Sequence, residues 1–328
     1  TGLPGAYGET PPLEFIRELY CLDSHYHQYR GNAAKVRKCP TTVAASRKFR
    51  TQNPALFSAS AWSDHPYPLG NDGNTPPTRT NYRNPNYASF PQLPHMIKAL
   101  DQAQRAYGSG KHFPLWNTEF AYITNPPNRL VKAVSSANQA YYDNWAEYLS
   151  WKNSRIASAM QFLLYDPNPS VGTAECGGFA SGLVYFTSAP TTAGCASYPP
   201  GVAKPGLDAY RLPIFLPSSS TRRGRTLTVW GCVRPAHYAL LDMRKPQTAQ
   251  IQFQRGSRGA WTTVSTVTFR RTSASCYFTA NVKFAASGSV RLSYAYPAGD
   301  SRLAAGIPNT NFVPGTPSVS RTVAVTIR

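Results

Sequence analysis

The pattern of hydrophobic residues in this sequence changes near the segment Pro217-Ser218-Ser219-Ser220. Before it, three nearly continuous apolar segments alternate with stretches of helical spacing. After it, short segments alternate apolar and polar residues between turn residues. The first pattern is typical of a parallel α/β sheet covered on both faces, and the second of an antiparallel sandwich. The 328 residues therefore predict two domains, 1–218 and 219–328.

The first domain is predicted to alternate helices with strands. Helical spacing covers four segments, 12–22, 91–107, 132–153 and 204–212. Buried strands are expected at 56–62, 113–122 and 156–165. In folds of this kind the chemistry sits at the carboxyl ends of the strands. His65, Glu119 and Asp166 fall at these ends and are the polar residues of interest.

The second domain is predicted to be all β. Six segments show strand alternation, at 226–233, 248–255, 261–270, 276–284, 288–296 and 319–328. Short strands at this spacing are typical of a β-sandwich. This domain holds 15 Lys and Arg against two acids, Asp242 and Asp300, out of a net charge of +19 for the whole chain. Such a surface favours polyanions, although charge in excess also serves solubility and defines no site geometry.

The cysteine spacing favours disulfides over a metal site. Six cysteines form three local pairs along the chain, Cys21 with Cys39, Cys176 with Cys195, and Cys232 with Cys276. Other connectivities remain open, since spacing alone suggests this one. The sequence has no CxxC motif and no Cys/His group with zinc spacing. We expect an oxidising, extracellular compartment, no metal and no cofactor.

The ends and the hydropathy of the chain add to this expectation. No apolar run is long enough to span a membrane, so we expect a secreted or cell-surface protein without a membrane span. Thr1 begins a Gly- and Pro-rich segment, and we expect that the natural start was removed by processing.

The segment Leu115-Trp116-Asn117-Thr118-Glu119-Phe120-Ala121-Tyr122 carries the clearest chemical signal. An apolar run ends in one carboxylate and then resumes with aromatic residues. A glycosidase strand presents its nucleophile in this way at the mouth of a barrel. A buried structural ion pair is the alternative for a lone glutamate in an apolar strand.

Three segments together resemble a known group of enzymes. They are Ala-Trp-Ser-Asp-His-Pro-Tyr-Pro at 61–68, Leu-Trp-Asn-Thr-Glu-Phe at 115–120, and Lys-Pro-Gly-Leu-Asp-Ala-Tyr-Arg-Leu-Pro at 204–213. They resemble the retaining clan A glycoside hydrolases, bacterial members near family 39 and the cellulase-like family 5. The resemblance covers about residues 1–217 and implies a (β/α)8 TIM barrel with Glu119 as the nucleophile on strand seven. The sandwich resembles the accessory β-domain of some members.

The resemblance also implies that half of the barrel is missing from this chain. Residues 1–8, 56–62, 113–119 and 157–165 correspond to strands five to eight. The acid/base glutamate of strand four, within an Asn-Glu-Pro motif, is absent. Because half a barrel exposes two strand edges, we expect the first half on a separate chain from one processed precursor, or lost by truncation. Glu9 is a local alternative for the acid/base.

Further residues are candidates for binding the sugar. His65 and Tyr67 border the predicted site and could orient Glu119, or His65 could be a structural histidine at a strand end. Trp62 and Trp116 could stack on a sugar ring, although core packing is an alternative for Trp116, which faces away from Glu119 by strand alternation. Two more candidates follow the last strand, Tyr165 and Asp166, the latter binding a sugar hydroxyl or an arginine. Glu175 is expected to be solvated.

We therefore predict a secreted glycoside hydrolase that acts on a poly- or oligosaccharide by a retaining mechanism. In that mechanism one carboxylate attacks the anomeric carbon and a second, protonated one lies ~5–5.5 Å away. The alternatives are a non-catalytic carbohydrate-binding protein on a degenerate barrel and a polyanion-binding protein that acts through its basic sandwich. No Gly-rich phosphate loop or Ser-His-Asp order supports another class of enzyme.

Overall fold

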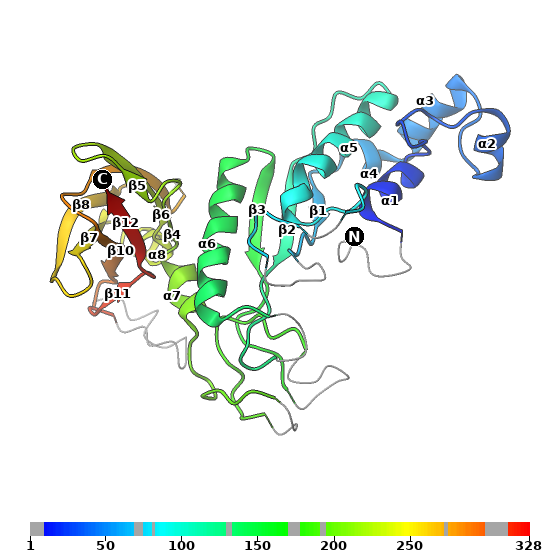
Figure 1. Cartoon of the computed structure of the whole chain (residues 1–328). Coiled ribbons are helices and arrows are strands. Elements are labelled where there is room, and N and C mark those ends of the chain that lie inside the picture. Colours follow the sequence, from blue (N-terminus) through cyan, green and yellow to red (C-terminus); the bar gives the residue numbers. More distant parts are fainter. Residues whose placement is uncertain are drawn as a thin grey trace. The chain divides into compact units, whose positions relative to one another are not determined.

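The computed structural model describes residues 10–68, 75–80, 83–128, 133–169, 178–190, 195–271, 275–298 and 314–328. The chain forms two compact units, which Figure 1 colours along the sequence. The first lies within Thr1–Tyr122 and Leu149–Phe162, and the second within Ile123–Tyr148 and Leu163–Arg328. The ranges of these units differ from those of the predicted domains, whose boundary near residue 218 stays a prediction.

The first unit is built on a parallel sheet. Its strands are β1 (Trp62–Asp64), β2 (Leu115–Phe120) and β3 (Ile156–Gln161), in the order β1-β2-β3. Trp62 pairs with Leu115, which in turn pairs with Ile156. Because all three strands are parallel, their carboxyl ends meet at one edge, as the sequence predicted for an α/β unit. Residues 1–8, the expected first strand, lie outside the described residues.

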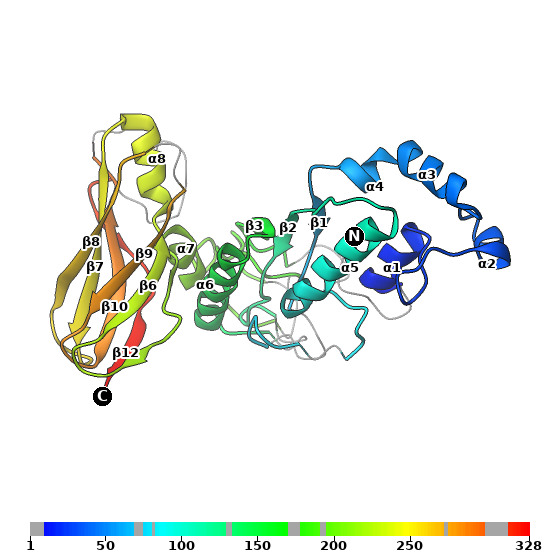
Figure 2. The same ribbon diagram turned by 90° about the horizontal axis from the view of Figure 1, so that it is seen from above.

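The helices of this unit precede β1 or lie between β1 and β2 in the sequence, and Figure 2 labels α1 to α5 in a second view. They are α1 (Pro12–Leu19), α2 (Gly31–Val36), α3 (Val43–Gln52), α4 (Pro54–Ser58), the 3-10 turn η1 (Phe90–Gln92) and α5 (Leu93–Ala106). Arg155, which precedes β3, binds both carboxylate oxygens of Asp101 on α5 at 3.0 Å and donates to the Phe113 carbonyl. This bidentate contact fixes α5 against the starts of two strands.

The predicted strand at 56–62 is wrong in its position. Residues Pro54–Ser58 form the helix α4, and the strand covers Trp62–Asp64. Pro54 stands in the first helical turn, where its fixed φ and missing N–H favour a helix start. Short apolar runs do not distinguish a strand from a buried helical turn, which is why the pattern misled. Helices α2, α3 and α8 (Arg234–Met243) were not predicted.

Some large apolar side chains on the strands of this sheet are open to solvent. Trp116 on β2 is 44% exposed and Met160 on β3 is 49% exposed. Trp116 is therefore not packed in a core of this chain, and its contact with a sugar stays a prediction. A parallel sheet is normally covered on both faces, so these side chains are unusual for a strand position.

The second unit joins helices to a β-sandwich. Its helices are α6 (Ser136–Lys152, as far as Tyr148), α7 (Pro205–Arg211) and α8. One sheet has the order β5-β12-β10-β7-β8 with β11 beside β10, and the other the order β4-β6-β9. The strands are β4 (Ile214–Phe215), β5 (Ser220–Thr221), β6 (Thr226–Cys232), β7 (Gln247–Arg255), β8 (Trp261–Phe269), β9 (Tyr277–Lys283), β10 (Gly288–Ala295), β11 (Pro317–Val319) and β12 (Val323–Ile327).

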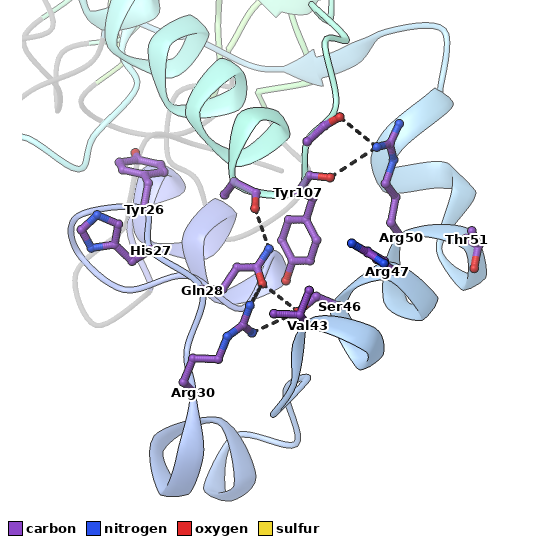
Figure 3. A pocket seen from close by; sticks show the side chains of 12 residues that line it. Tyr26, His27, Gln28, Arg30, Val43, Ser46, Arg47, Arg50, Thr51 and Tyr107 are labelled. Carbon is purple, nitrogen blue, oxygen red and sulfur yellow. Dashed lines mark hydrogen bonds between the residues drawn. The ribbon is translucent and has the colours of Figure 1, made fainter.

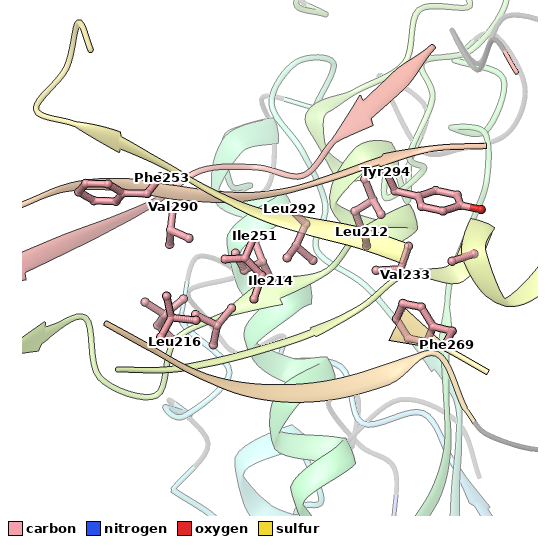
Figure 4. Close-up of a cluster of buried hydrophobic side chains, with 14 of the residues drawn as sticks. Leu212, Ile214, Leu216, Val233, Ile251, Phe253, Phe269, Val290, Leu292 and Tyr294 are labelled. Atoms are coloured by element: carbon pink, nitrogen blue, oxygen red, sulfur yellow. The ribbon is translucent and has the colours of Figure 1, made fainter. Parts of the chain in front are cut away.

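The two sheets enclose one apolar core, shown in Figure 4. Ile251 and Val290 from one sheet and Val229 from the other are fully buried. Period-two alternation produces this arrangement, since every second side chain of a strand faces the partner sheet. Leu212 and Ile214, which precede residue 219, also belong to this core.

Two of the three predicted disulfides lie within the described residues. Cys21 is bonded to Cys39, and Cys232 to Cys276. Cys195 is also disulfide-bonded, and its predicted partner Cys176 lies outside the described residues. In the described part of the chain, no helix is both long and apolar enough to cross a membrane.

Candidate functional site

Glu119 lies near the carboxyl end of β2, with 31% of its side chain exposed. Its Oε2 accepts a hydrogen bond from the Tyr67 hydroxyl at 2.8 Å, and Nδ1 of His65 lies 3.4 Å from the same oxygen. Tyr67 and His65 follow β1, the strand paired with β2. Parallel pairing therefore brings Glu119 next to His65 and Tyr67, which lie more than fifty positions before it in the sequence.

Tyr67 is positioned as a hydrogen-bond donor to the Glu119 carboxylate. Its side chain is almost entirely buried at 2% exposure, and its ring meets Phe162 edge to face. Burial, followed by the hydrogen bond to Glu119, raises the pKa of Tyr67 far above its usual value. The phenol therefore stays protonated and keeps the hydrogen atom that it donates to Glu119.

Substituting Tyr67 by phenylalanine should lower kcat and leave KM nearly unchanged if Glu119 acts as a nucleophile. A hydrogen bond to a charged group contributes about 1.5–3 kcal/mol, so we expect roughly a 10- to 100-fold fall. Steady-state kinetics on a glycan substrate measures the effect. Tyr26→Phe, which changes a tyrosine away from the site, is the matched control. Unchanged kcat for Tyr67→Phe would show that this contact does not serve catalysis.

Asp64 is a buried acid beside this site that the sequence reading did not single out. It is 2% exposed, and its Oδ2 has no hydrogen-bonding partner among the described residues. Burial raises the pKa of Asp64 from 3.8 to about 7, against the smaller opposing effect of the His65 backbone N–H. An aspartate at the end of a short strand looks solvent-facing in the sequence, so only the structure reveals its burial.

The stability of the protein should fall as the pH rises from about 4 to about 7 because of Asp64. Over that window the folded state keeps the Asp64 proton that the unfolded chain releases, so raising the pH favours unfolding. Asp64→Asn, which is neutral at every pH, should remove this part of the fall. Urea unfolding across the window tests it, with the exposed Glu18→Gln as control. An unchanged slope for Asp64→Asn would contradict the assignment.

The chain has distant structural neighbours among known proteins. A family 39 glycoside hydrolase from Bacteroides cellulosilyticus aligns with a TM-score of 0.34 and 12% identity, over 86% of this chain and 55% of that one. A β-glucuronidase from Bacteroides uniformis aligns with a TM-score of 0.28 and 10% identity, over 86% of this chain and 28% of that one. Distant neighbours are thus glycoside hydrolases. No model of a protein family matches the chain, and no curated protein does.

The chain spans about half, or less, of the length of these structures. The two tryptophans predicted to stack on a sugar differ in their exposure to solvent. The side chain of Trp116 is exposed, whereas Trp62 is half-buried and its Nε1 has no hydrogen-bonding partner among the described residues.

Asp166 belongs to the second unit and forms a buried ion pair. Its Oδ1 accepts from Nζ of Lys204 at 2.7 Å and from the backbone N–H of Gly182 at 2.8 Å. Lys204 also donates to Thr124 and lies 4.9 Å from the ring centre of Tyr185. Asp166 is therefore paired with a lysine, whereas the sequence led us to expect an arginine or a sugar hydroxyl as its partner. Tyr165 precedes it and pairs with Val184 through an isolated bridge.

The sequence did not indicate a special role for Asp143, an acidic residue of the second unit. Asp143 on α6 is half-buried, but both of its carboxylate oxygens are shielded from solvent and have no hydrogen-bonding partner among the described residues. Burial and then the charge of Glu147 raise the pKa of Asp143 well above its usual value. The described residues bring no three His, Cys, Asp or Glu side chains together as a metal site.

Proposed function

We propose that this chain is part of a secreted glycoside hydrolase that cleaves O-glycosidic bonds of a poly- or oligosaccharide. The observation that carries the proposal is the Glu119 carboxylate, held by Tyr67 and His65 at the end of a parallel strand. A half-exposed carboxylate with a buried phenol as donor suits an ionised nucleophile. The disulfides agree with an extracellular setting.

In the proposed mechanism Glu119 attacks the anomeric carbon of the bound sugar. Both contacts fall on Oε2, and no described residue hydrogen-bonds to Oε1, so Oε1 is the oxygen that forms the glycosyl-enzyme bond. A protonated carboxyl gives its proton to the departing glycosidic oxygen. The same group then removes a proton from water, which releases the sugar with its configuration retained and frees Glu119.

The acid/base carboxyl is assigned to the half of the barrel outside residues 1–328, on a preceding segment or a separate chain. Two features support a missing half: the short three-stranded sheet and the exposed Trp116 and Met160 on its strands. Glu9, the local alternative, lies outside the described residues. Intact-mass analysis of the natural protein tests this proposal, since a whole barrel needs about 250 residues and a partner chain would supply the remainder.

Covalent trapping tests the retaining mechanism directly. We expect that a panel of 2-deoxy-2-fluoro glycosyl fluorides leaves one sugar attached to the natural protein, because the fluorine slows release of the intermediate. Peptide mapping should place that sugar on Glu119. A sugar found on another carboxylate would reassign the nucleophile. Turnover without any adduct, and with inverted product by NMR, would refute the retaining mechanism.

A second candidate function is polyanion binding by the basic sandwich. Its charge balance is the observation in favour, 15 Lys and Arg against two acids after residue 218. Retention of the intact chain on heparin at increasing salt tests it, because polyanion contacts weaken steeply with salt. If glycans bind but none is cleaved, the chain would instead be a non-catalytic carbohydrate-binding protein.

A further inference from the structure

A strongly basic lobe lies within the first unit. Residues 24–63 contain seven Lys and Arg and no Asp or Glu. Helices α2 and α3 belong to this stretch, and the Cys21–Cys39 disulfide ties its beginning to the segment before α3. Thr42 caps α3, since its hydroxyl accepts from the Ala45 N–H at 3.1 Å. The lobe is thus locally fixed and carries uniform charge.

This lobe contains a hollow of about 820 Å³, shown in Figure 3. Three arginines line it, Arg30 before α2 and Arg47 and Arg50 on α3, and no acidic residue lines it. Arg47 and Arg50 are three positions apart on a helix and so share one face. Figure 3 shows them on the α3 side of the hollow, with Arg30 and Gln28 on another side.

Neutral acceptors hold two of these arginines in place. One terminal nitrogen of Arg30 donates to the Ser46 hydroxyl at 3.0 Å, and one of Arg50 donates to the carbonyls of Tyr107 and Gly108 at 3.3 and 3.0 Å. Because these acceptors carry no charge, they orient the guanidinium groups without neutralising them. His27, which also lines the hollow, lies 3.7 Å from the Asp23 carboxylate.

Arg47 has its full set of donors available. It is exposed, and within the described chain it has neither a hydrogen-bond acceptor nor a carboxylate partner. The planar fork of arginine matches oxyanions in two-point geometry. Three guanidinium groups at separate positions around one hollow suit an anion that offers oxygens in several directions, as a tetrahedral group does and a planar carboxylate does not.

We propose that this hollow binds a tetrahedral oxyanion, the sulfate or phosphate ester group of a ligand. The proposal concerns residues distinct from Glu119, Tyr67 and His65, and it does not depend on the proposed hydrolase activity. The intact Glu119→Gln variant should therefore bind the same probes with unchanged affinity. Loss of hydrolysis and loss of oxyanion binding can then be told apart in one set of proteins.

The test is calorimetric titration of the intact chain with four probes: a sulfated heparin tetrasaccharide, its desulfated form, glucose 6-phosphate and glucose. We expect binding of the sulfated or the phosphorylated probe, and which of the two binds more tightly identifies the source of the oxyanion. Arg47→Gln should weaken that binding about tenfold, the equivalent of one lost charged hydrogen-bonding contact. The two probes without a sulfate or phosphate ester, the desulfated tetrasaccharide and glucose, should show no dependence on Arg47.

Lys48→Gln is the matched control, because it removes the same charge from the next residue of α3, which does not line the hollow. It should change affinity less than about twofold, as expected for a screened surface charge. Equal losses of affinity for Arg47→Gln and Lys48→Gln would overturn the proposal, because the binding would then depend only on the total charge of the chain. Binding of duplex DNA with the same affinity and no dependence on Arg47 would overturn it too. Failure of every charged probe to bind would overturn it as well.

Discussion

Replacing Glu119 by glutamine should abolish glycan hydrolysis while leaving the protein folded. The amide keeps the shape of the side chain and still accepts a hydrogen bond from Tyr67, but it cannot attack the anomeric carbon. Loss of a nucleophile from a group that acts as a unit costs ~10⁴-fold or more in kcat. Initial rates on the natural substrate, or on an activated aryl glycoside, measure the fall.

The control for this substitution is Glu18→Gln, which changes an exposed carboxylate, 48% exposed, in the same unit. It should leave the rate unchanged. A smaller variant, Glu119→Ala, sharpens the test because it opens space for azide, which can attack in place of the carboxylate. Azide should restore turnover and give a glycosyl azide of inverted configuration. If Glu119→Gln hydrolyses every tested glycan at the rate of the unchanged protein, Glu119 is not the nucleophile.

The sequence predicted the β-sandwich closely. Each of the six alternating segments contains one of its main strands, and two predicted cysteine pairs are bonded. Period-two alternation is a reliable signal because one face of each strand packs on the core and the other meets solvent. Helix α8 escaped because Arg234–Met243 follows a strand directly, with Pro235 in its first turn, and was absorbed into the connection between strands.

The first unit was harder to predict, and the reason lies in short segments. Leu56 and Phe57 form an apolar run of the length of a strand, and Pro54 turns that run into the helix α4. The pairing of β1 with β2 could be predicted, since the sequence pattern assigned both strands to one sheet. It follows that Tyr67 and His65 could be predicted as neighbours of Glu119.

Other features of the site depend on packing that no local pattern records. Asp64 differs from a solvated aspartate only through its burial, which the sequence does not show. The partner of Asp166 is Lys204, from a motif the sequence reading assigned to the last barrel helix. A contact between two residues 38 positions apart is set by the tertiary fold, so sequence spacing cannot predict it.

Breaking the Lys204–Asp166 pair should strongly destabilise the second unit. The two side chains are 0% and 1% exposed and 2.7 Å apart. Burial lowers the pKa of Lys204, and the Asp166 carboxylate opposes that effect, so each charge depends on the other for its stability. Lys204→Met leaves Asp166 buried without its cation, and such losses cost about 3–5 kcal/mol of the free energy of unfolding. Urea unfolding followed by circular dichroism measures the change.

Arg37→Met is the control, because Arg37 and Glu18 form an exposed pair 3.9 Å apart whose loss should cost less than about 1 kcal/mol. Lys204→Met combined with Asp166→Leu should recover much of the stability, since an apolar pair needs no compensating charge. The Gly182 N–H, which donates to Asp166, would still lose its acceptor, so recovery should be incomplete. Equal losses for Lys204→Met and Arg37→Met would mean that the buried pair contributes no more than a solvated one.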